Sequence, residues 1–230
     1  MQKKWIAALL LAMPLAHAAD TAPKLGSDEQ KAAYALGYRM GAGLQRDAAD
    51  LDVEIVKKGM SDGCRKQAPA LNEEAMVNAM QAYQQKRAND MAAKNGAAAK
   101  KFLAENAKKL GVITLPSGLQ YLVVKSGSGA SPQRSDSVKV HYHGTLLDGQ
   151  VFDSSVQRGA PATFGVGQVI PGWVEALQKM KVGDKWMLYI PPELAYGNRG
   201  MGPILPGSLL TFEVELLDVL PPAAAKPAVK

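Results

Sequence analysis

The stretch 138–155, "VKVHYHGTLLDGQVFDSS", decides the fold class of the C-terminal half of the chain. Its first residues alternate, so that one face carries Val138, Val140 and Tyr142 and the other carries Lys139, His141 and His143. A period of two is typical of a strand with one buried face. The pair Asp148-Gly149 is a strong signal for a tight turn between two strands. The stretch therefore predicts a β-hairpin that packs on a core through one face.

Further strand-like runs lie on both sides of this hairpin. They are "LQYLVV" (119–124), "KWMLYIPPE" (185–193) and "LLTFEVELLDVL" (209–220). One short helix is expected between them, because Pro171 and Gly172 suit a helix start and Gly183 suits its end. Trp173, directly behind this start, is on its own best read as a core residue. Antiparallel strands around one short helix predict an α+β fold for residues 111–220.

Residues 27–110 have a different composition, rich in Ala, Gln, Lys and Met and almost without Pro. Ser27 suits the start of a first helix, a second is expected from about Asp52 to Ser61, and a third from Asn72 to Leu110. Gly96 is the only residue expected to break the third helix. Unbroken, it would span roughly 58 Å at about 1.5 Å per residue, so it would project from one body or separate two.

The first predicted helix is rich in small residues, with Gly37, Gly41 and Gly43 in "YALGYRMGAGL". Glycines cost helix stability, so close approach of another helix is a reason to keep them. One interpretation is a helical hairpin packed within a single chain. The other is a subunit interface, because three helices with so little apolar material make a poor core alone. We favour the interface and expect an intertwined homodimer formed through residues 19–110.

The two ends of the chain differ from its middle in composition. It begins with two lysines, an apolar run over residues 5–15 and the small residues "AHA" at 16–18, which is the order of a secretory signal peptide. A membrane anchor is the alternative, but it would need about 20 apolar residues and this run is short. We expect cleavage after Ala18 and export to the periplasm, with outer-membrane association or release left open. Residues 221–230 are expected to form a disordered tail.

The net charge and the cysteine content give no support to several classes of function. The formal charge is +6, and it falls to +4 without residues 1–18, which hold two lysines and no acid. The lysines are spread out without interleaved aromatic residues, so no nucleic-acid partner is expected. Cys64 is the single cysteine, which rules out an intrachain disulfide. We expect a free, buried thiol there, with a bridge between subunits as the alternative.

Motifs for classical cofactor and hydrolytic chemistry do not occur either. The chain has no glycine-rich phosphate loop, no Gly-x-Ser-x-Gly elbow and no His-Glu-x-x-His helix. His141 and His143 lie two apart on one strand face, which is a possible pair of metal ligands, but a third ligand is missing. We therefore expect both histidines to face solvent and expect no metal or cofactor.

What remains is a set of aromatic and apolar residues placed at strand ends and in loops. It consists of Tyr142, Phe152, Phe164, Val169, Ile170, Trp173, Tyr196, Ile204 and Phe212. Each of these residues taken alone is more often part of a core than of a ligand site.

Four stretches around them resemble the FKBP-type peptidyl-prolyl isomerases. These are "HYHGTLLDGQVFDSS", "RGAPATFGVGQVIPGWVEALQKMKVGDKW", "IPPELAYG" and "LTFEVELLDV", and the resemblance covers residues 115–219. The helical segment and the leader are similar to those of the Mip/FkpA branch of that family, which contains exported, dimeric isomerases of Gram-negative bacteria.

The resemblance implies a twisted antiparallel sheet wrapped around the helix that starts at Trp173, with Trp173 as the floor of an apolar pocket. It implies walls made by Tyr142, Phe152, Phe164 and Phe212, a preceding loop with Val169 and Ile170, a mouth at Tyr196, and a charged rim at Asp153 and Arg158. Asp153 would accept a hydrogen bond from Tyr142, and the N–H of Ile170 would hold a substrate carbonyl.

The loop after Tyr196 departs from the common family pattern. "GNRGMGPILPGS" (197–208) places Met201 and Gly202 where many relatives have other residues. Counting back from Phe212 selects Ile204, rather than Leu205, as the residue that faces the pocket. Substrate preference and affinity for macrolide inhibitors are the properties that this departure affects most.

By this resemblance, Tyr142, Phe152, Asp153, Trp173, Tyr196 and Phe212 are the predicted catalytic residues. Arg158, Phe164, Val169, Ile170 and Ile204 are the predicted substrate-binding residues. The expected activity is prolyl cis-trans isomerisation in the folding of envelope proteins. One alternative is a chaperone whose helical arms hold unfolded chains independently of catalysis. A pseudo-enzyme that uses the pocket only to bind a partner is a further alternative.

Overall fold

The computed structural model describes residues 23–220, so the predicted leader (1–18) and tail (221–230) lie outside the described residues. The chain divides between Ala70 and Leu71 into two compact units, and each is described by itself. No helix within residues 23–220 combines the length and the apolar character needed to cross a membrane.

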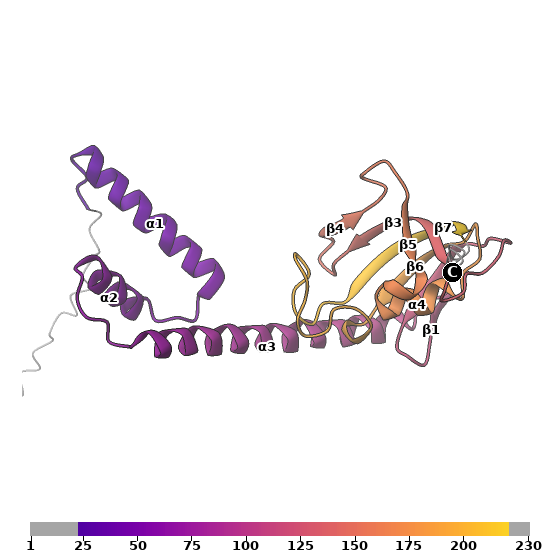
Figure 1. The fold of residues 1–230 in the computed structure, drawn as a ribbon, viewed down its shortest axis with the longest axis horizontal. Coiled ribbons are helices and arrows are strands. Elements are labelled where there is room, and N and C mark those ends of the chain that lie inside the picture. The colour runs from indigo at the N-terminus through magenta and orange to yellow at the C-terminus, as the bar shows by residue number, and fades with distance from the viewer. Residues whose placement is uncertain (1–22, 221–230) are drawn as a thin grey trace, which may run out of the picture. The chain divides into compact units, whose positions relative to one another are not determined.

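The first unit contains helices α1 (Asp28–Ala48) and α2 (Val53–Cys64) (Figure 1). Both begin where the sequence predicts, because side-chain oxygens satisfy free N–H groups of the first turn. Ser27 and Gln30 form a reciprocal capping box on α1, and Asp52 accepts from two N–H groups of α2. Cys64 is exposed, which corrects the expected buried thiol, since neither helix has a buried residue.

The second unit begins with α3 (Glu73–Asn106), capped by Asn72 as predicted. The helix continues through Gly96 without a break, and its 34 residues span about 51 Å at about 1.5 Å per residue. It ends four residues before the predicted end at Leu110, because the chain then folds into turns that lead to the first strand. Only Ala92, Ala99 and Asn106 of this helix are buried, and the half-buried Asn95 and Phe102 also contact the rest of the unit.

The remainder of this unit is an antiparallel sheet with one short helix (Figure 1). Its strands are β1 (Val112–Thr114), β2 (Gln120–Lys125), β3 (Ser137–Thr145), β4 (Val151–Ser154), β5 (Ala162–Gly165), β6 (Lys185–Ile190) and β7 (Leu210–Leu220). The spatial order is β1-β2-β6-β7-β3-β4, and β5 pairs with β3. Two 3₁₀ turns, η1 (Val166–Gln168) and η2 (Pro192–Leu194), lie in the connections. The predicted α+β class is confirmed.

The alternation along β3 predicts its faces correctly. Val138, Val140 and Tyr142 are buried, and the residues between them are exposed or half-buried. The hairpin after β3 closes at the predicted place, with the N–H of Leu146 donating to the carbonyl of Gln150 at 2.9 Å. Gly149 has a φ of 85°, a value that favours glycine, which explains why the turn uses Asp-Gly.

Helix α4 (Pro171–Leu177) packs against the buried face of the sheet. Pro171 occupies its first turn, where the missing N–H costs nothing. Gly172 allows close approach to the sheet, since a Cβ there would lie 2.5 Å from Cγ2 of Ile190. The helix therefore places Trp173 directly over the core, with only 4% of its surface exposed.

Candidate active site

A cavity of about 580 Å³ opens above Trp173. It is lined by Tyr142, Phe152, Asp153, Phe164, Gln168, Val169, Ile170, Trp173, Tyr196, Met201, Gly202, Pro203, Ile204 and Phe212. The structure thus brings together the predicted site residues, with the exception of Arg158, around one mostly apolar hollow.

The floor of the cavity is an indole ring held by three other rings. The centroid of Trp173 lies 5.5 Å from that of Tyr142, 5.8 Å from that of Phe164 and 5.2 Å from that of Phe212. The three pairs are edge-to-face, with interplanar angles between 78° and 88°, an arrangement that aromatic rings prefer. The indole N–H has no hydrogen-bond partner within the described residues. The floor is therefore rigid and almost free of polar contacts.

One wall depends on a glycine that the sequence analysis did not single out. Phe152 and Phe212 meet edge-to-face, with their centroids 5.3 Å apart. Gly144 lies beside both rings, and a Cβ on it would approach Phe152 Cζ to 2.7 Å and Phe212 Cε1 to 2.8 Å. The only signal in the sequence is a glycine inside an alternating strand, which often marks close approach of another group.

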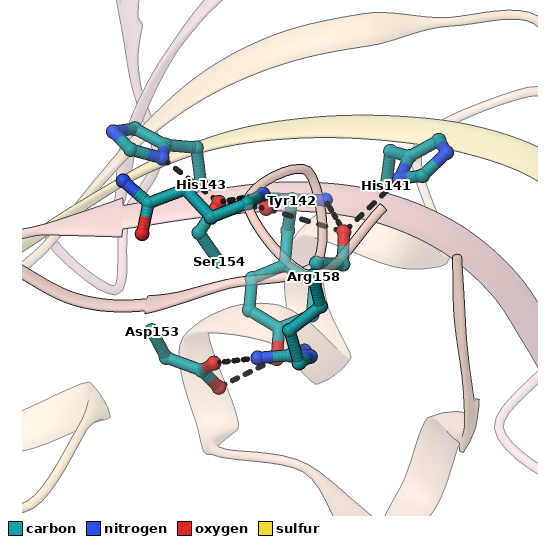
Figure 2. A network of polar contacts seen from close by, with 8 residues as sticks. His141, Tyr142, His143, Asp153, Ser154 and Arg158 are labelled. Atoms are coloured by element: carbon teal, nitrogen blue, oxygen red, sulfur yellow. Dashed lines mark hydrogen bonds and ion pairs between the residues drawn. The ribbon is translucent and has the colours of Figure 1, made fainter. Parts of the chain in front are cut away.

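The charged rim is a three-residue network around the Tyr142 hydroxyl (Figure 2). This hydroxyl donates to Oδ2 of Asp153 at 2.5 Å and accepts from Nη2 of Arg158 at 2.7 Å. Arg158 also donates through Nη1 to the carboxylate of Asp153, and its guanidinium carbon lies 5.5 Å from the centre of the Tyr142 ring. Arg158 does not line the cavity, so it contacts the site through Tyr142 and Asp153.

The network and its burial shift the pKa values of three groups away from neutrality. Burial, supported by Asp153, raises the pKa of Tyr142. Burial by itself would raise the pKa of Asp153, but hydrogen bonds from Tyr142 and Arg158 outweigh it and lower the value. Burial and the charge of Asp153 raise the pKa of Tyr196. At neutral pH the site therefore presents neutral phenols and one ionised carboxylate.

The loop before α4 and the loop before β7 both line the cavity. Ile170 is the N-cap residue of α4, so its N–H precedes the first helical turn, where N–H groups lack helical partners. Ile204 is 5% exposed and lines the cavity, whereas Leu205 is 47% exposed. Met201, which is 56% exposed, also lines the cavity; it was not among the predicted site residues, although its loop was noted as a departure from the family pattern.

His141 and His143 lie on the opposite side of β3 from the ring of Tyr142 (Figure 2). Their Nδ1 atoms contact serine hydroxyls, His141 with Ser155 at 3.1 Å and His143 with Ser154 at 3.0 Å. Both histidines are half-buried, less open to solvent than expected. Among residues 23–220, no cluster of three or more His, Cys, Asp or Glu side chains could hold a metal ion.

Comparisons with known proteins identify the family. Residues 129–217 match the family model for FKBP-type peptidyl-prolyl cis-trans isomerases, and residues 29–123 match the domain found amino-terminal to such isomerases. The chain is 42% identical to the outer membrane protein MIP of Legionella longbeachae over 95% of this chain and 98% of that protein. The chain belongs to the FKBP-type peptidyl-prolyl cis-trans isomerases. The enzyme is thus a prolyl isomerase, as the sequence predicts.

Two further relatives of this isomerase cover most of its length. The FKBP-type 22 kDa isomerase of Escherichia coli is 45% identical over 87% of this chain and all of that protein. The crystal structure of FkpA from Escherichia coli superposes with a TM-score of 0.67, at 39% identity, over 86% of this chain and 100% of that chain. The expected order, a helical part followed by an FKBP-like sheet, is therefore confirmed for this isomerase.

Proposed function

We propose that the cavity above Trp173 is the catalytic site of this isomerase and that it works by favouring a twisted prolyl amide. The observation that carries this proposal is the buried indole floor, surrounded edge-on by three aromatic rings, at the bottom of an open hollow. A proline ring fits such a surface, because it is compact and has no N–H to satisfy.

The physical basis is the electronic structure of the amide. Rotation about the peptide bond must break its resonance, which sets a barrier of about 18–20 kcal/mol. The twisted amide has less charge separation than either planar form, so an apolar, water-poor cavity disfavours the planar forms more. Only interactions that are stronger in the transition state than in the ground state accelerate a reaction. A thousandfold acceleration requires about 4 kcal/mol of such preference.

In this mechanism the polar groups orient either the peptide or a ring of the cavity, and none transfers a proton. The N–H of Ile170 donates to a substrate carbonyl, and the hydroxyl of Tyr196 reaches the peptide at the mouth. Asp153 and Arg158 hold the Tyr142 ring in place through its hydroxyl. Tyr142, Phe152, Asp153, Trp173, Tyr196 and Phe212 form the catalytic surface, and Phe164, Val169, Ile170 and Ile204 bind the flanking chain. Arg158 acts from outside the cavity as a positioning residue.

The test is turnover of a short Xaa-Pro peptide by full-length variants. Replacing Phe152, Asp153 and Trp173 together should lower kcat/KM at least hundredfold, and Phe152→Ala alone should lower it about tenfold. Leu147→Ala is the control, because Leu147 is 40% exposed and does not line the cavity. Circular dichroism identifies variants that remain folded. Full activity in the folded triple variant would refute this site, and a macrolide inhibitor that competes with the peptide would support it.

We also propose that the isomerase is exported to the periplasm, with its leader removed near Ala18, and assists folding of envelope proteins there. The printed name of the Legionella relative, outer membrane protein MIP, supports an envelope location and leaves outer-membrane association open. N-terminal sequencing of protein from a periplasmic fraction tests this. An intact leader in cytoplasmic protein would count against it.

A homodimer formed through residues 19–110 is the assembly that we propose. The support is the apolar surface of α1 and α2, where Leu36 is 63% exposed, Tyr38 67% and Ile55 70%. Such side chains are costly to leave in water, at about 25 cal/mol for each Å² of apolar area. Sedimentation equilibrium should give twice the chain mass for the natural protein and one chain mass for a Tyr38→Glu/Ile55→Glu variant. A monomeric natural protein would refute the dimer.

The same apolar surface favours a second candidate function, a chaperone that holds unfolded chains independently of catalysis. A full-length variant without isomerase activity distinguishes the two, because a holding activity would survive in it. Suppression of aggregation of an unfolded client by this variant would support the chaperone function. Loss of suppression together with turnover would assign the folding assistance to the cavity alone.

A further inference from the structure

The loop of residues 197–208 supplies one side of the cavity. Met201, Gly202, Pro203 and Ile204 of this loop line the hollow, and Ile204 is only 5% exposed. The loop has no strand partner in the sheet, so something else must fix where Ile204 lies relative to Trp173.

Helix α3 contacts the far end of this loop. The side-chain amide of Asn95 donates through Nδ2 to the carbonyl of Pro206 at 2.8 Å, in a half-buried position. The next residue, Gly207, lies so close to the helix that a Cβ on it would be 2.4 Å from the carbonyl oxygen of Ala92. Its φ of 73° also favours glycine. Loop backbone and helix backbone are therefore in direct contact.

The helix is itself fixed to the sheet about two to three turns beyond Asn95. The side chain of Gln120 on β2 donates to the carbonyl of Leu103 at 2.9 Å and accepts from Asn106 at 3.0 Å. The ring of Phe102 lies 5.7 Å from that of Tyr189 on β6. Because the C-terminal part of α3 is held to the sheet at several points, the continuous helix can act as a rigid support for the loop.

Bonds within the loop connect the docked end to the cavity. The N–H of Gly207 donates to the carbonyl of Gly197 at 2.9 Å. Met201 and Ile204 exchange two reciprocal backbone hydrogen bonds, at 2.8 and 2.9 Å. A shift of residues 206–207 would therefore move Ile204, since the short chain between them is braced on both sides.

We propose that Asn95 of α3 is a positioning residue for prolyl isomerisation, holding the 197–208 loop so that Ile204 closes the side of the cavity. Asn95 touches neither substrate nor the cavity, and it acts through Pro206. This inference rests on the proposed assignment of the cavity as the catalytic site. The proposal gives α3 a role in catalysis in addition to its role as a connecting helix.

Three substitutions at one position test the donor. Asn95→Ala removes the amide, Asn95→Asp keeps the shape but puts an acceptor beside a carbonyl, and Asn95→Gln keeps an amide donor. The first two should lower kcat/KM for a short Xaa-Pro peptide about two- to tenfold, the range that one net hydrogen bond allows. Asn95→Gln should restore at least part of it. Asn78→Ala is the matched control, an exposed asparagine on the same helix.

Amide hydrogen exchange separates positioning from general destabilisation. In full-length Asn95→Ala, the amides of Met201 and Ile204 should exchange faster while those of β3 stay unchanged. Unchanged kcat/KM in Asn95→Asp, an equal loss in Asn78→Ala, or equally faster exchange in β3 would each overturn the inference. The folded triple variant at Phe152, Asp153 and Trp173 distinguishes the two proposals, because full activity in it refutes the cavity as the site whatever Asn95 does.

Discussion

Removing a single oxygen from one wall of the site separates an orienting role from a chemical one. Tyr142→Phe keeps the ring, which contacts Phe164, Trp173 and Phe212, and deletes only the hydroxyl. That hydroxyl makes two hydrogen bonds, a donation to Asp153 and an acceptance from Arg158. The variant therefore tests whether the enzyme needs this group for more than holding the ring in place.

The expected cost follows from the two bonds and their exposure. A hydrogen bond to a charged group contributes about 1.5–3 kcal/mol to stability. The side chains of Arg158 and Asp153 are 52% and 45% exposed and remain paired with one another. Hydrogen bonds to water and the remaining ion pair therefore compensate for most of the stabilisation lost with the hydroxyl. We expect about 1–2 kcal/mol lower stability and at most about a tenfold lower kcat/KM. A residue that donated a proton in the reaction would instead account for about 10²–10⁴-fold.

The measurement is kcat/KM on a short Xaa-Pro peptide, together with the free energy of unfolding in urea. Tyr121→Phe is the matched control, because Tyr121 stacks on Trp186, with centroids 4.2 Å apart, and does not line the cavity. It should leave kcat/KM unchanged. A loss above a hundredfold in a folded Tyr142→Phe enzyme would refute the mechanism without proton transfer.

Three other outcomes follow from the same geometry. Because the pKa of Asp153 is lowered from 3.8 and that of Tyr142 is raised from 10.0, kcat/KM should be constant within about twofold from pH 6 to about pH 9. A bell-shaped profile would contradict this. The contribution of Asp153 to stability should be present above about pH 4 and should be lost progressively as the pH falls from there toward its lowered pKa in the folded enzyme. Gly144→Ala should lower kcat/KM at least tenfold and stability by about 1–3 kcal/mol, because the new methyl would displace two aromatic walls; wild-type turnover in this variant would show that the cavity adapts. Residues 71–220 should unfold at a higher temperature than residues 111–220, by calorimetry, because α3 buries part of its surface on the sheet; equal midpoints would place the domain boundary near residue 111.

Local chemistry made the helix starts and the strand faces predictable. Ser27, Asp52 and Asn72 each stand before a run without proline, and a cap of this kind acts within one turn. The alternation from Val138 to Tyr142 has a period that only a strand can use.

The docking of α3 on the sheet could not be read from its sequence. The buried positions are Ala92, Ala99 and Asn106, which produce no apolar stripe of large residues. The change of composition near residue 111 instead suggested that the helix and the sheet belong to separate bodies, whereas the compact units divide at Ala70.

For the site, the aromatic residues were reached through the family resemblance, because their spacing alone fits a core equally well. Gly144 and Asn95 were missed because each acts through close approach of segments distant in the sequence, Gly144 beside Phe152 and Phe212 and Asn95 beside Pro206. Pairwise distances of this kind leave no periodic trace in one chain.

The serine pair at the end of β4 has a consequence for how the enzyme tolerates insertions. Ser155 exchanges hydrogen bonds with Tyr142, its Oγ accepting from the Tyr142 N–H at 2.8 Å and its N–H donating to the Tyr142 carbonyl at 3.0 Å. These bonds fix the register of β3 against β4. A slip of one residue would turn the ring of Tyr142 toward solvent and a histidine toward the cavity. Length variation among natural or engineered versions should therefore collect at the hairpin tip near Gly149, where an added residue leaves this alignment intact.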